Sequence, residues 1–276
     1  RSADNVTTRT LWQRVRRIWV TLGLLVTVAF VGWSLIAYSA TSEAKEKARG
    51  DARVEVVEVN GIVAFSATAQ KQAMPVGLVF FPGSGVDPRA YAPLAYAVAE
   101  AGYPVILVPL PRRGMFGGAD APELITTAMN AVHDDQRAYR WIIGGHSRGA
   151  VIATKIVADL AALGANSAAG LLLIGTSHPR DVDLSKLRRP VTKIVGTNDG
   201  IATPERVEAN KHLLPASTNW VRIEGGNHSQ FGWYGFQPGD HFADISRDAQ
   251  HKQMIDAVIA MIRSVSEQEN LDGLPR

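Results

Sequence analysis

The chain has 276 residues, of which 46% are hydrophobic, and this is long enough to bury one sizeable core. It contains no cysteine, which excludes disulfides, thiolate metal sites and a cysteine nucleophile. The net charge of +3 is concentrated in residues 1–40, which contain five arginines and one aspartate. The remainder is nearly neutral and lacks the basic patch that a nucleic-acid-binding domain needs.

Residues 18–40 form a run of 23 uncharged, mostly apolar residues, and about 20 such residues in a helix span a bilayer core. Residues 1–17 form a basic arm directly before the run, which predicts a cytoplasmic N-terminus and an exported remainder. The sequence therefore predicts a single-pass signal anchor at 18–40, followed by a solvated linker at 41–50. A cleaved signal peptide, giving a secreted product, is the alternative, although its apolar region is typically only about 7–15 residues long.

Residues 51–276 are predicted to form one domain in which apolar strands alternate with helices. This alternation predicts an α/β fold with a mostly parallel sheet covered by helices on both faces. Only about a dozen residues separate the strands at 169–177 and 191–200, which is too few for a large cap domain. The predicted strands are 53–69 (a hairpin around Asn60-Gly61), 76–83, 103–111, 140–145, 169–177, 191–200 and 219–228, and the predicted helices are 88–102, 121–135, 148–164, 203–215 and 248–267.

Residues 145–149 read G-H-S-R-G at the junction between a predicted strand and a predicted helix. In this context the pattern is typical of a nucleophile elbow, a strained turn that exposes a serine hydroxyl. The flanking glycines leave room where side chains would collide. The sequence therefore predicts Ser147 as a nucleophile, and an ordinary tight turn is the alternative.

A serine nucleophile needs a base that removes its proton, and seven histidines are available. His228 follows a predicted strand in a glycine-rich loop and is the predicted base. His146 is expected to point away from the neighbouring hydroxyl. His133, His212 and His251 lie on or beside amphipathic helices and are expected at the surface.

The base needs a carboxylate that orients it. Asp199 lies near the end of the segment 191–200, just past its buried part at 191–197, and is the predicted partner of the histidine. Capping of the next helix is the alternative role for Asp199, and Asp181 and Asp183 are weaker candidates for the catalytic acid.

Two backbone N–H groups are needed to bind the oxyanion of the tetrahedral intermediate. One is predicted to be the amide of Arg148, which follows the nucleophile. The other is predicted to come from Ser84 or Gly85 in the glycine-rich loop at 79–87. A simple strand-ending turn is the alternative for that loop.

Three segments, "GGHSRGA", "GTNDG" and "GGNHSQFG", carry a resemblance that extends over about residues 54–265. The candidate nucleophile, acid and base occur along the chain in the order Ser, Asp, His. In this order and in these segments the chain resembles the α/β-hydrolase superfamily. It most resembles small bacterial hydrolases of the dienelactone-hydrolase-like and lipase-like branch, some of which are membrane-anchored and share the "HSQFGWYGFQPGD" type of run. The resemblance implies an esterase with Ser147, Asp199 and His228 as its triad. True dienelactone hydrolases use a cysteine nucleophile, which is missing here, so their substrate is not expected.

The expected reaction is hydrolysis of a small-molecule or lipid-like carboxylic ester through an acyl-enzyme, without metal or cofactor. Thioesterase, amidase or peptidase activity would use the same triad, and a non-catalytic binding protein is a further alternative. The sequence makes no prediction of oligomeric state. Predicted substrate contacts are Phe231, Trp233 and Tyr234, which could instead pack against the C-terminal helix, together with Met115 and Phe116 in a glycine-rich loop.

Overall fold

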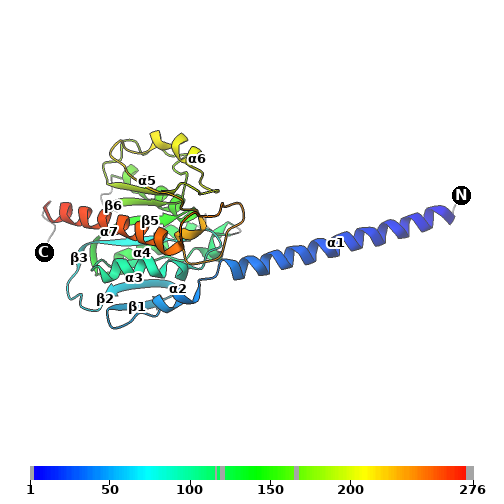
Figure 1. Ribbon diagram of the computed structural model, residues 1–276, viewed down its shortest axis with the longest axis horizontal. Helices are drawn as coiled ribbons and strands as arrows, with labels where there is room; N and C mark the ends of the chain where they lie inside the picture. The colour runs from blue at the N-terminus through cyan, green and yellow to red at the C-terminus, as the bar shows by residue number, and fades with distance from the viewer. Residues whose placement is uncertain (1–2, 116, 119–121, 165–167, 272–276) are drawn as a thin grey trace.

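The structure is a computed structural model that describes residues 3–115, 117–118, 122–164 and 168–271. Figure 1 shows an α/β body and one long helix, α1 (Ala3–Ala37), that extends away from it. The body is built on an eight-stranded sheet with the order β1-β2-β4-β3-β5-β6-β7-β8. The strands are β1 (Val54–Val59), β2 (Ile62–Ala67), β3 (Met74–Phe81), β4 (Val105–Leu107), β5 (Ala138–His146), β6 (Ala168–Ile174), β7 (Val191–Gly196) and β8 (Asn219–Ile223).

The sheet is mostly parallel, as predicted. Strands β3 to β8 pair in parallel, whereas β1 and β2 form an antiparallel hairpin that joins β4 at one end of the sheet. Asn60 and Gly61 both have positive φ in the hairpin turn, which is the conformation that a two-residue type I′ turn requires. Since parallel strands end at the same edge, the loops that follow β3, β5, β7 and β8 meet there.

Helices cover both faces of the sheet. Successive side chains of a strand point to opposite faces, and Leu78 and Phe80 of β3 therefore join the core beneath α3 and α7, while Val79 and Phe81 join the core beneath α4 and α5. The α-helices of the body are α2 (Ser42–Lys47), α3 (Ala92–Glu100), α4 (Pro122–Asp134), α5 (Arg148–Ala162), α6 (Pro204–Ala209) and α7 (Arg247–Leu271). Short 3₁₀ turns are η1 (Pro88–Tyr91), η2 (Pro111–Gly114), η4 (Lys211–Leu213) and η5 (Ser229–Phe231).

The segment at 41–50 differs from the solvated linker that was expected. It contains α2, whose first turn is capped by Thr41 Oγ1, which accepts a hydrogen bond from Ala44 N at 3.4 Å. Ala44 is fully buried and belongs to the same core as α3. The prediction of a solvated linker at 41–50 is therefore wrong, because this segment forms a helix that packs on the body.

The apolar run predicted at 18–40 is helical as far as Ala37, within α1. Within Thr10–Ala37, a window of 18 residues has a mean hydropathy of 2.2, and none of that window is buried against the body. By length and composition this helix can cross a membrane, and a signal sequence near an N-terminus has the same properties.

Residues 175–190, between β6 and β7, contain neither helix nor strand. The site at the carboxyl edge of the sheet is therefore not covered by a cap domain inserted at this point.

Candidate active site

Ser147 occupies the turn between β5 and α5. Its backbone has φ 53° and ψ −116°, a strained conformation for a residue with a side chain. Its amide donates a hydrogen bond to Ile174 O on the neighbouring strand at 2.9 Å. The turn is thus fixed to the sheet, and Ser147 remains partly exposed at its carboxyl edge.

The two glycines that flank the serine are required by close backbone contacts. A Cβ on Gly145 would lie 2.4 Å from the carbonyl carbon of Gly149, and a Cβ on Gly149 would lie 2.0 Å from Phe81 O. Backbone atoms cannot rotate out of the way as a side chain can. The first turn of α5 therefore packs directly on the loop that follows β3, where the predicted oxyanion donors lie.

Asp199 and His228 form a buried hydrogen-bonded pair at the ends of β7 and β8. Asp199 Oδ2 lies 2.8 Å from His228 Nδ1, and the two side chains are 1% and 0% exposed. The other carboxylate oxygen, Oδ1, accepts from the amides of Ile201 and Ala202 at 2.8 and 2.6 Å. Because the carboxylate can only accept, Nδ1 carries the proton and Nε2 is the basic nitrogen. Nε2 is buried and has no hydrogen-bond partner in the part of the chain that the structure describes.

Asp181 and Asp183, the weaker candidates for the acid, are exposed, and Asp183 accepts a hydrogen bond from Ser185 N at 2.8 Å. The histidine partner is thus Asp199. A helix-capping role does not describe Asp199, because Thr203 is the N-cap of α6 and accepts from Arg206 N.

A second buried carboxylate, Asp240, joins the loops that carry Asp199 and His228. Sequence reasoning missed this residue, although it lies in the "HSQFGWYGFQPGD" run. Its side chain is 8% exposed. The five donors to its carboxylate are Gly200 N (3.0 Å), His228 N (3.2 Å), Ser229 N (2.7 Å), Ser229 Oγ (2.7 Å) and His241 N (2.9 Å). Charge-assisted hydrogen bonds of this kind are about twice as strong as neutral ones. Asp240 therefore fixes the loop that carries Asp199 relative to the loop that carries His228.

The predicted oxyanion donors need one correction. Gly85 N already donates to Arg113 O at 2.6 Å, so this amide is not available to an oxyanion. Ser84 N has no acceptor in the described part of the chain, whereas its hydroxyl donates to Gly114 O at 3.2 Å. Arg148 is the first residue of α5, at the helix end where the macrodipole favours negative charge.

His146 is fully buried beside His228, the predicted base, and the centroids of the two rings are 4.5 Å apart. Its Nδ1 lies 2.7 Å from the hydroxyl of Tyr91, which also accepts from Gly83 N at 3.1 Å. Burial, reinforced by His228 and His251, lowers the pKa of His146 well below its ordinary value, and burial raises the pKa of Tyr91. His146 is therefore a neutral side chain that ties the elbow to the loop after β3.

The predicted substrate contacts fall into three groups. Phe231 and Tyr234 are fully buried in the core and so take the packing role that was the alternative for them. Trp233 is partly buried, and its Nε1 donates to Nδ1 of His251 at 3.2 Å. His251, expected at the surface, is only 3% exposed because α7 packs this face inward. Met115 is half-buried on a loop that contacts residues 84–85, and Phe116 lies outside the described residues.

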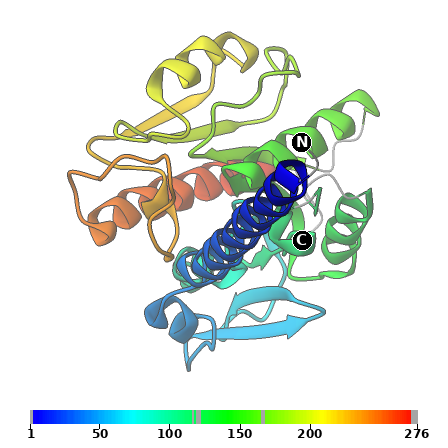
Figure 2. The same ribbon diagram turned by 90° about the vertical axis from the view of Figure 1, so that its right-hand side faces the viewer.

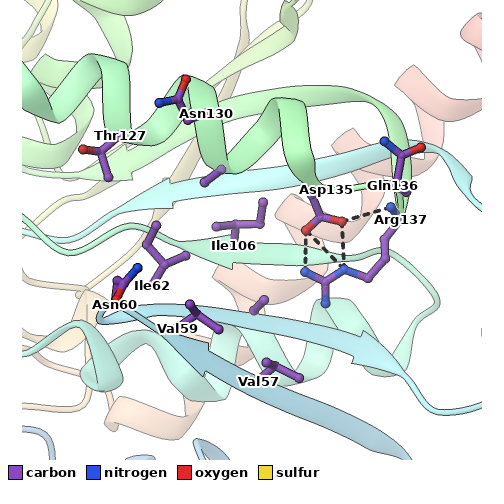
Figure 3. A pocket seen from close by; sticks show the side chains of 12 residues that line it. Val57, Val59, Asn60, Ile62, Ile106, Thr127, Asn130, Asp135, Gln136 and Arg137 are labelled. Carbon is purple, nitrogen blue, oxygen red and sulfur yellow. Dashed lines mark hydrogen bonds and ion pairs between the residues drawn. The ribbon is translucent and has the colours of Figure 1, made fainter.

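A separate cavity of about 670 Å³ lies between the β1–β2 hairpin and the end of α4. Figure 3 shows Val57, Val59 and Ile62 along its strand side, and the ion pair between Asp135 and Arg137 at one end. The residues of the proposed catalytic chemistry do not line it. Among the described residues, no group of three or more His, Asp or Glu side chains could hold a metal ion.

Comparison with known proteins agrees with the fold. The sequence model of the alpha/beta hydrolase family matches residues 77–252. A fungal esterase from Rhizomucor miehei is similar in structure, with a TM-score of 0.59 and 15% identity over 86% of this chain and 90% of that chain. An esterase from Pyrobaculum calidifontis has a TM-score of 0.59 and 16% identity over 81% of this chain and 89% of that chain. At these identities the likeness concerns the fold. No curated protein matches the chain.

Proposed function

The chain belongs to the alpha/beta hydrolase family, and from this premise we propose that it is a serine hydrolase that cleaves carboxylic esters through an acyl-enzyme. The observation that carries the proposal is the buried Asp199–His228 pair, whose Nε2 has no partner in the described chain. The ring of His228 contacts that of His146, the residue directly before a serine held at positive φ. Buried polar atoms are normally hydrogen-bonded. Nε2 of His146 is unpartnered as well, but only in His228 does a carboxylate hold the proton on Nδ1 and leave Nε2 as an acceptor, which supports a role for His228 in proton transfer.

The proposed reaction has two halves. His228 Nε2 accepts the proton of Ser147 as Oγ attacks the ester carbonyl, and the oxyanion that forms is bound by the amides of Arg148 and Ser84. The C–O bond to the alcohol then breaks, and His228 returns the proton to the leaving oxygen. In the second half His228 removes a proton from water, the resulting hydroxide attacks the acyl carbon, and Ser147 leaves with the proton. Asp199 stabilises the imidazolium in both halves.

The ester, rather than a thioester or amide, is favoured by the structural likeness to esterases. Thioesterase, amidase and peptidase activities use the same triad and are tested alongside. We retain Trp233, Met115 and Phe116 as proposed substrate contacts, because the first two lie on loops at the same edge of the sheet as Ser147.

The function is tested with a series of p-nitrophenyl esters of increasing acyl length and with fluorophosphonate labelling. We expect turnover and labelling by the wild type and neither by Ser147→Ala. Ser264→Ala, an exposed serine on α7, is the matched control and should behave as wild type. An absence of both ester turnover and labelling in the wild type contradicts the proposal, and turnover confined to acyl-CoA or amides assigns the alternative.

We also propose that α1 is a retained single-pass anchor and that the hydrolase domain lies on the extracytoplasmic side. The arginine-rich arm before the apolar run supports this orientation. Carbonate extraction and N-terminal sequencing of the purified protein provide the test. A soluble product that begins near Ala40 contradicts a retained anchor.

A further inference from the structure

The end of α1 is fixed directly to the two loops of the candidate active site. Ala37 O accepts a hydrogen bond from Gly235 N at 2.6 Å, and Tyr38 O accepts from Asp87 N at 2.9 Å. Thr41 N donates to Trp233 O at 2.9 Å. The loop after β3, which carries Ser84, and the loop after His228 therefore both bind the residues that follow the helix.

Side-chain packing reinforces this junction. The ring of Tyr38 packs edge-on to that of Tyr234, with centroids 6.0 Å apart. A Cβ on Gly85 would lie 2.8 Å from Cδ2 of Tyr38, which shows how closely the ring covers the loop of the predicted oxyanion donors. No flexible spacer separates α1 from the site, so a bilayer around α1 begins beside the carboxyl edge of the sheet. Figure 2 views this face, with α1 standing in front of it.

The same face carries an exposed aromatic pair on the loop after β8. Phe236 and Phe242 stack with their centroids 4.9 Å apart and are 38% and 81% exposed. Phe236 directly follows Gly235, the residue bonded to Ala37. The backbone near Phe242 is also fixed, because Asn198 Nδ2 donates to its carbonyl at 3.4 Å and Asp240 accepts from the preceding amide of His241. The loop thus presents exposed apolar rings beside the last residue of an apolar helix.

We propose that this aromatic pair inserts into the membrane interface around α1, so that the active-site edge rests on the bilayer and the substrate is an ester of a membrane lipid. The inference rests on the proposed esterase function and on the proposed anchor. On membrane-surface helices, apolar faces that carry Phe bury into the boundary between headgroups and acyl chains, where the ester carbonyls of glycerolipids also lie. A second protein is the other possible occupant of an exposed aromatic patch, but the attachment of this loop to the end of α1 places it where a bilayer would be.

The docking is tested in the full chain without relying on catalysis. Since the chain has no cysteine, Phe242→Cys carries a single environment-sensitive fluorophore. Leu163→Cys is the matched control, because Leu163 is also 81% exposed but lies just beyond the end of α5 opposite to Ser147. In phosphatidylcholine proteoliposomes we expect a blue-shifted emission that is quenched by spin-labelled lipid at position 242 and not at 163. A water-like emission at 242 overturns the docking, and so does a blue shift that lipid-borne quenchers leave unchanged, which indicates a protein contact.

The substrate class is tested with Phe242→Ser and the control Leu163→Ser in proteoliposomes. We expect Phe242→Ser to lower hydrolysis of a fluorogenic glycerolipid ester in the bilayer about tenfold or more, and to leave hydrolysis of soluble p-nitrophenyl acetate within about twofold of wild type. An equal loss on both substrates, or no loss on either, contradicts the lipid-ester assignment. A wild type that docks but hydrolyses no ester refutes the proposed function while leaving the docking result intact.

Discussion

Gly149→Ala provides a direct test of how the nucleophile elbow and the loop after β3 are fitted together. The new Cβ would lie 2.0 Å from Phe81 O, 2.5 Å from Phe81 C and 2.6 Å from Pro82 O. Relief of the closest contact to an acceptable 3.0 Å requires a backbone movement of about 1 Å between α5 and this loop. That movement separates the amides of Arg148 and Ser84, which we propose bind the oxyanion.

A misplacement of about 1 Å in catalytic groups costs roughly 10²-fold in rate, which is about 2.7 kcal/mol of transition-state stabilisation. Overpacking of this kind also costs about 1–3 kcal/mol of folding stability. We therefore expect Gly149→Ala to remain folded with a reduced Tm and to lose about 10²-fold in kcat/KM on p-nitrophenyl butyrate, with active-site concentration measured by fluorophosphonate titration.

Gly77→Ala separates the loss of stability from the loss of catalysis. Its Cβ would lie 2.5 Å from Cζ3 of Trp141, in the first half of β3 and four residues before Phe81. This variant should lose Tm while the folded protein retains its kcat/KM. Wild-type kcat/KM in Gly149→Ala, or an equal loss in Gly77→Ala, would refute the reasoning.

Three other variants test buried polar side chains. Burial lowers the pKa of Lys193 from 10.5 to about 7. Between about pH 7 and pH 10.5 the folded state therefore binds fewer protons than the unfolded state. The free energy of unfolding should then rise by up to about 1.4 kcal/mol per pH unit over this range. In urea unfolding, Lys193→Met should remove this slope, and an unchanged slope contradicts the assignment. Asp240→Asn should lower kcat by about tenfold or more and cost on the order of 3 kcal/mol of stability, because its amide cannot accept from all the donors around it, whereas the exposed Asp248→Asn should do neither. Tyr91→Phe leaves Nδ1 of His146 without its partner and should cost about 1–3 kcal/mol in thermal unfolding; a Tm equal to wild type shows that the contact is not stabilising.

The fold and the central pair of the site could be predicted because both depend on local patterns. Continuous apolar strands predict burial on both faces, and the crossover helices then make the sheet parallel. In such a sheet any residue directly after a strand lies at one known edge, which is why Asp199 and His228 could be placed together although they are far apart in sequence. The requirement for glycine around Ser147 follows from sterics that are the same in any strand-to-helix turn of this kind.

The remaining features depend on which surfaces meet in the folded chain. Charged residues at 41–50 predicted a solvated linker, but Ala44 and Ala48, four residues apart, pack a short helix against the core that contains α3. His251 is buried because α7 packs along its length, which its polar neighbours did not indicate. The availability of the Gly85 amide could not be judged either, since its acceptor, Arg113 O, belongs to another loop. Asp240 was missed for the same reason, because its donors come from two loops.

The hydrogen-bonded chain from Gly83 through Tyr91 to His146 makes the support of the site insensitive to acidity. The pKa of His146 is lowered and that of Tyr91 is raised, so both groups stay uncharged across the neutral range. The contact between the turn at Ser147 and the loop after β3 then does not change with pH. The electrostatic field that His146 and Tyr91 exert on His228 does not change either. Neither His146 nor Tyr91 should therefore contribute a titrating group to the acidic limb of an activity profile.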